Sequence, residues 1–129
     1  MLEFTMNDTV YQFNFGIGFL REINKTMASP VDGVPGAKKN VGYQYALGGL
    51  IDGDVEALIK ILDIANKTQT PRVTMTVLEK FVENETTDID MVFEQVIDFL
   101  SNANSTKKVT KQLIEAVERE RAKKEAQNQ

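Results

Sequence analysis

The first 15 residues alternate between apolar and polar positions, which is typical of strands buried on one face. Two such runs, LEFTM and VYQFNF, flank the pair Asn7–Asp8. A two-residue turn there would place Phe4 opposite Tyr11 and Leu2 opposite Phe13, so that both apolar sets share one face. A loop one residue longer would turn one strand's apolar side chains to the other face. The pattern therefore predicts a tight β-hairpin.

The apolar period changes from two residues to that of a helix just after Gly16. A helical spacing relates Ile17, Leu20, Ile23, Asn24 and Met27, which predicts that a strand becomes a helix here. The short run GIG therefore marks the joint between a strand and a helix, because glycine permits a sharp change of direction. A phosphate loop is disfavoured, since arginine stands where the third glycine of G-x-G-x-x-G is needed. We expect the side chains of Phe13, Phe15, Phe19 and Leu20 in the core and those of Arg21 and Glu22 in solvent.

The middle of the chain begins with a segment, 28–40, that has two prolines, two glycines and no period, so it is expected to be a mobile loop. A short helix over 43–51 follows. Asp54 then suits the N-cap of a helix carrying Val55, Leu58, Ile59, Leu62 and Ala65 on one face. Asp52, Asp54 and Glu56 resemble the start of a calcium loop, but alanine occupies the position of its required glycine. A helix cap explains these acids better.

The second half of the chain contains three further helical patterns. The first follows a capping box at Thr76–Glu79. The second repeats at Ile89, Phe93, Val96, Ile97 and Leu100, with enough additional apolar residues to be either central in the fold or a partner's contact surface. The last has only a narrow stripe of Val109, Leu113, Ile114 and Val117. Beyond residue 117 there is little to bury, so this end is expected to fray or to project into solvent.

These elements together predict an α+β fold that is mainly α, with an N-terminal β-hairpin followed by about five helices. We expect a body of residues 1–106 and a charged C-terminal helix of residues 107–129. The 129 residues are typical in number of a single domain.

Composition restricts the chemistry, because the chain has neither cysteine nor histidine. Catalytic triads, thiolate nucleophiles and the commonest transition-metal ligands are thereby excluded. We predict that the protein is not an enzyme and that it has no catalytic, cofactor-binding or metal site. No stretch is apolar enough to span a membrane, and MLEFTMND lacks the features of a secretory signal, so we expect a cytosolic protein without a membrane partner.

Charge is distributed unevenly along the chain. Residues 1–106 contain eight Lys/Arg and fifteen Asp/Glu, whereas residues 107–129 contain seven Lys/Arg and four Glu. Such asymmetry is typical of an acidic body with a mildly basic tail. Glutamates alternate with the tail's lysines, and nucleic-acid binding prefers a concentrated basic face. A nucleic-acid partner is therefore disfavoured.

Two stretches resemble phage tail assembly chaperones, notably those of long-tailed phages of Gram-positive hosts. The first is FNFGIGFLREI, through Phe13, Phe15, Gly16, Gly18, Phe19, Leu20, Arg21, Glu22 and Ile23. The second is GGLIDGDVEALIKIL, through Gly53, Asp54, Val55 and Leu58. The two blocks account for the first half of the chain. The second half is similar only in length, helicity and charged ending.

The resemblance implies a chaperone that binds the apolar tape-measure protein and promotes tail-tube polymerisation around it. It also implies that the protein works in the host bacterial cytoplasm and is absent from the mature virion. Contact with the tail-tube protein would involve a longer, frameshifted form, and self-association is expected. A structural adaptor that stays in an assembled phage or bacterial particle is the alternative. The expected partner-binding residues are Phe93, Val96, Leu100, Val109, Leu113, Ile114 and Val117.

Overall fold

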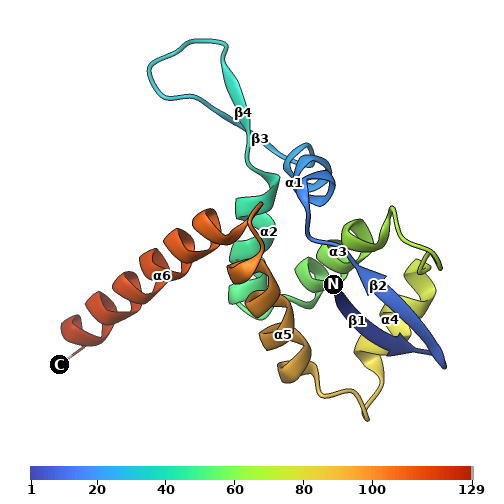
Figure 1. Cartoon of the computed structure of the whole chain (residues 1–129). Coiled ribbons are helices and arrows are strands. Elements are labelled where there is room, and N and C mark those ends of the chain that lie inside the picture. The colour runs from blue at the N-terminus through green and yellow to red at the C-terminus, as the bar shows by residue number, and fades with distance from the viewer. Residues whose placement is uncertain (129) are drawn as a thin grey trace.

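The computed structural model describes residues 1–128 and confirms a mainly α-helical α+β fold that begins with a β-hairpin (Figure 1). Six helices follow the hairpin within the described residues, against about five expected. In chain order the elements are β1 (Leu2–Met6), β2 (Thr9–Phe13), α1 (Ile17–Asn24), β3 (Ala28–Pro30), β4 (Lys38–Asn40), α2 (Gly42–Ile51), α3 (Val55–Asn66), α4 (Met75–Glu83), α5 (Ile89–Asn102) and α6 (Lys107–Gln127).

The N-terminal hairpin has the predicted register. Phe4 pairs with Tyr11 and Leu2 pairs with Phe13 across antiparallel β1 and β2. The turn residues Asn7 and Asp8 have φ angles of 51° and 61°. Asparagine and aspartate tolerate this left-handed conformation, which a two-residue hairpin turn requires at both positions. The apolar face of the hairpin packs on α3 and α4.

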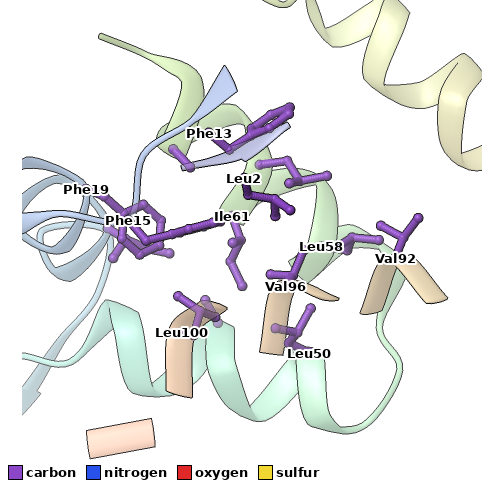
Figure 2. Close-up of a cluster of buried hydrophobic side chains, with 14 of the residues drawn as sticks. Leu2, Phe13, Phe15, Phe19, Leu50, Leu58, Ile61, Val92, Val96 and Leu100 are labelled. Carbon is purple, nitrogen blue, oxygen red and sulfur yellow. The ribbon is translucent and has the colours of Figure 1, made fainter. Parts of the chain in front are cut away.

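Helix α5 contributes three buried residues to the core and packs on α6 and α2. Val96 and Leu100 have no exposed surface, and Val92 is nearly as buried. Figure 2 shows these side chains among Leu50 of α2 and Leu58 of α3. Of the two roles that its broad apolar surface permits, α5 therefore has mainly the structural one.

Helix N-caps agree with the predictions at one position and differ at another. The Asp54 side chain accepts a hydrogen bond of 2.9 Å from the backbone N–H of Glu56, so it caps α3 as expected. The cap of α4 is Thr74, whose hydroxyl accepts from the N–H of Val77. The capping box predicted at Thr76–Glu79 is therefore wrong by two residues, because the helix already begins at Met75.

Residues 28–40 form a two-stranded ribbon where we expected a loop without regular structure. β3 pairs antiparallel with β4, and Ser29 lies opposite Lys39. We call residues 28–40 the β3–β4 arm. Figure 1 shows the arm extending away from the helices. The apolar period was absent because the ribbon does not lie on the core, so its strands need no apolar face.

Asn66 connects the hairpin to the end of α3. Its side chain is fully buried and donates hydrogen bonds to the carbonyls of Gln12 and Pro71, at 3.0 and 3.1 Å. Its oxygen accepts from the backbone N–H of Val73 at 2.7 Å and from the Arg72 guanidinium at 3.2 Å. One side chain thus holds three segments together, and it places the strand-to-helix joint against the helical layer.

Candidate functional site

Helix α6 is attached to the body by a chain of buried hydroxyl groups. The Tyr43 hydroxyl of α2 lies 2.6 Å from Oγ1 of Thr110. Thr110 donates to the carbonyl of Thr106 at 2.7 Å, and Thr106 donates to the carbonyl of Leu100 at 2.7 Å. Since a threonine hydroxyl has one hydrogen, Tyr43 is the donor to Thr110. This series of hydrogen bonds fixes the first half of α6 against α2 and α5.

Burial of Tyr43 changes its acidity. Loss of hydration raises the pKa of the Tyr43 hydroxyl to about 12, although hydrogen bonding to Thr110 opposes the rise. The phenol therefore stays protonated near neutral pH, and its hydrogen remains available to Thr110.

The second half of α6 has no contact with the core. All residues from Glu118 to Asn128 are exposed, and Figure 1 shows this end of the helix projecting from the body. At 1.5 Å per residue, the 21 residues of α6 extend over about 31 Å. The division of the chain into a body of residues 1–106 and a C-terminal helix stays a prediction. The first half of α6 packs on α5 and α2.

The structure separates the seven expected partner-binding residues into three groups. Val96 and Leu100 are core residues without exposed surface, so in the folded protein they are not available to a partner. Phe93, Val109 and Leu113 are half-buried and pack against the core. Ile114 and Val117 are half-buried but lie outside the core cluster. The α6 pair is therefore the part of the set most open to a partner.

A second apolar surface lies at the strand-to-helix joint. A groove of about 730 Å³ separates this joint from the turn between α5 and α6. Exposed Met1 and Ile17 lie at its edge, with 63% and 53% of their surface in solvent. Two contacts join its walls. The Phe15 and Phe99 rings lie 6.3 Å apart, and the Ser105 hydroxyl donates a hydrogen bond to the Phe15 carbonyl at 2.6 Å. We call it the joint groove.

Sequence reasoning did not find the joint groove, because its walls come from three distant parts of the chain. It did place the nearby aromatic residues correctly. Phe13, Phe15 and Phe19 are buried and Leu20 is half-buried, whereas Arg21 and Glu22 are exposed. One residue could have indicated the groove from the sequence. Ile17 is apolar and begins α1, but the buried residues of that helix are Phe19 and Ile23.

No charged side chain of the described residues lines the joint groove, whereas Val117 of α6 shares a pocket with Asp52, Glu120, Arg121 and Lys124. The joint groove is lined by neutral polar residues such as Asn14, Asn102 and Asn104. Among residues 1–128 there is no cluster of three or more Asp and Glu side chains arranged to hold a metal ion. No helix in that range is both long and apolar enough to cross a membrane. The joint groove is suited to apolar contact and hydrogen bonding, whereas the α6 surface also presents charged groups.

Comparison with protein-family models gives one decisive result: residues 3–115 match the model of the phage tail assembly chaperone protein, TAC. This match covers most of the chain. The chain belongs to the phage tail assembly chaperone family. Neither the curated proteins nor the solved structures gave a match.

Membership of the chaperone family extends the resemblance beyond the two blocks in the first half. The matched region includes α4, all of α5 and the first part of α6, and it ends at Glu115, near where α6 leaves the body. A tail assembly chaperone has protein partners in the phage tail, which agrees with partly exposed apolar side chains on the surface.

Proposed function

We propose that this chaperone binds the tape-measure protein and promotes tail-tube polymerisation around it, without catalysis. The observation that carries the proposal is the family match over residues 3–115. It is supported by the two partly exposed apolar surfaces, on α6 and at the joint groove. A long helical client with exposed apolar side chains stays soluble when such surfaces cover it.

The α6 surface is the first candidate for client contact. Ile114 and Val117 present apolar area outside the core cluster. The other three half-buried residues of the expected set also keep part of their surface exposed: Phe93, Val109 and Leu113. An amphipathic client helix would bury these side chains, while the charged residues after Val117 keep the complex in solution.

The remaining partners follow from the same proposal. The tail-tube protein would be recruited by a longer form of the chaperone, made by a frameshift, in which α6 connects the body to an appended domain. The chaperone would act in the host cytoplasm and be absent from the finished virion. A structural adaptor would instead remain in the finished virion. Quantitative mass spectrometry of purified virions would then find it in fixed proportion to the tail proteins.

The client surface is tested by pulling down the chaperone with a tagged tape-measure fragment. Ile114→Asp/Val117→Asp should reduce retention at least tenfold, because two charges enter an apolar contact. Gln112→Asp/Ala122→Asp is the matched control, since it adds the same charge to exposed positions of α6. Circular dichroism establishes that each variant is folded.

The joint groove gives the competing result. If Ile17→Asp abolishes retention while Ile114→Asp/Val117→Asp binds like the wild type, the client site is the joint groove and the α6 surface is not involved. If all three variants bind like the wild type, neither apolar surface holds the client.

A further inference from the structure

The β3–β4 arm ends in an apolar tip that has no partner within the described chain. Val34 is 51% exposed at the tip, next to Pro35 and half-buried Val31. The backbone of the tip is ordered by hydrogen bonds from Val31 N–H to the Ala37 carbonyl at 3.0 Å and from Ala37 N–H to the Val34 carbonyl at 3.2 Å. The tip therefore holds the Val34 side chain in solvent at the end of an ordered turn.

The stem of the arm is basic. Lys38 and Lys39 follow the tip on β4, and both are exposed. Asp32 is the arm's one acidic residue, so the arm carries a net charge of +1. A surface that accepts the arm should therefore be apolar in its floor and acidic at its rim.

A groove between α3 and α4 has these properties. It measures about 530 Å³, and its lining includes Val55 and Met75, which are 39% and 45% exposed. Ile59, Ile64 and Val82 complete the apolar lining. We call it the α3–α4 groove.

The rim of the α3–α4 groove is acidic. Glu56, Glu79, Glu83 and Asp63 line it, with Lys60 as the one basic residue. Asp63 is engaged by Arg72, whose Nη2 lies 2.9 Å from its carboxylate. The three glutamates form no ion pair within residues 1–128, so their charge is open to an incoming cation.

The arm and the groove lie on different sides of the same molecule. Figure 1 shows the arm extending away from the helices, with α4 beside the hairpin. The arm of one chain therefore cannot fill its own groove, whereas the arm of another chain can. We propose that the β3–β4 arm of one copy binds the α3–α4 groove of a second copy, with Val34 in the apolar floor and Lys38 and Lys39 beside Glu79 and Glu83.

This contact joins two different surfaces, so each copy keeps a free arm and a free groove for further copies. The two surfaces are separate from Ile114, Val117 and the joint groove, and the contact does not depend on the proposed client. Its test uses the purified chain alone, so that a failure here leaves the client proposal standing.

Reversal of charge on each surface tests the pairing. Lys38→Glu/Lys39→Glu and Glu79→Lys/Glu83→Lys each place like charges at the contact, so each should weaken self-association about tenfold or more at low ionic strength. When the two variants are mixed, every arm again meets a groove of opposite charge, and association should return. Light scattering after size exclusion and sedimentation velocity measure the mass.

Three outcomes would overturn the proposal. The first is a wild-type mass that stays at 14.5 kDa at the highest concentration. The second is either charge-reversal variant associating as strongly as the wild type. The third is a mixture of the two variants that remains monomeric. Lys123→Glu/Lys124→Glu is the matched control, because it reverses two exposed charges on the projecting end of α6 and should not change the mass. Val34→Asp should weaken association without changing the fold.

Discussion

Two buried polar side chains, Asn66 and Tyr43, connect parts of the fold that are far apart in the sequence. Asn66 satisfies backbone groups of β2 and of the segment before α4. Tyr43 joins α2 to α6 through Thr110. Both are polar and fully or almost fully buried, so each depends on its hydrogen bonds to offset the cost of lost hydration.

We expect Asn66→Ala to lower the free energy of unfolding by about 2–4 kcal/mol, because it leaves the buried Val73 N–H and two partly buried carbonyls without their partner. Urea denaturation measures the change. The exposed Asn104→Ala provides the control and should stay within about 0.5 kcal/mol of the wild type. A loss below 1 kcal/mol for Asn66→Ala would show that water replaces its hydrogen bonds.

Tyr43 should make stability depend on alkaline pH. Its pKa is about 12 in the folded protein, above its ordinary value of 10, so the folded state holds the proton more tightly. The resulting stabilisation is complete below pH 10 and is lost as the pH rises from 10 to 12. The difference of about two pKa units corresponds to about 2–3 kcal/mol.

Urea denaturation at pH 9 and at pH 11.5 tests this prediction. Tyr43→Phe should be less stable at pH 9 by about 1 kcal/mol, through loss of the bond to Thr110, and should fall less steeply with pH. Tyr45→Phe, at a position 63% exposed, should keep the wild-type slope. Parallel pH profiles for the wild type and Tyr43→Phe would contradict the account.

At the scale of elements, close approach of helices depends on particular glycines. An added Cβ at Gly42 would lie 2.9 Å from the carbonyl carbon of Ile23 and closer still to its oxygen, so α1 and α2 meet there backbone to backbone. Gly48, in the same helix, has no such neighbour within 4 Å. Because the two glycines share one helix, they form a matched pair.

Gly42→Ala should destabilise the protein by about 1–3 kcal/mol or more, because the Ile23 backbone cannot move aside without shifting α1. Gly48→Ala should instead stabilise it by about 0.5–1 kcal/mol, since alanine favours the helix. Chemical denaturation of the two variants compares them directly. Equal effects would mean that the α1–α2 contact is looser than the structure has it.

Helix α6 combines a docked half with an exposed half. Removal of residues 118–129 should therefore change the free energy of unfolding by less than about 0.5 kcal/mol, because residues 118–128 contact no core residue. Thermal denaturation checks this expectation. A loss of several kcal/mol would show that the charged end helps to hold the body together.

Sequence patterns predicted the local elements well, since alternation and helical period report directly on a buried face. The hairpin register and the Asp54 cap were both available in this way. The pattern at Val96 and Leu100 could not distinguish a core face from a partner face, because both need apolar side chains. The Asn66 contacts, the joint groove and the β3–β4 arm depend on residues far apart in sequence or on a ribbon without a buried face, so no local period reports them.

At the scale of the whole molecule, the α6 surface and the joint groove each leave apolar side chains partly exposed. The proposed contact between the arm and the α3–α4 groove would allow self-association and leave those surfaces free. A chaperone built in this way would hold an apolar client along several copies at once. The main effect of such a chaperone would be to keep its client soluble.

The most direct measurement is co-expression of the chaperone with a tagged fragment of the tape-measure protein, followed by size-exclusion chromatography. We predict that the fragment is insoluble alone and elutes in a soluble complex with the chaperone. An insoluble fragment beside free chaperone would contradict the proposed function and would favour a structural adaptor.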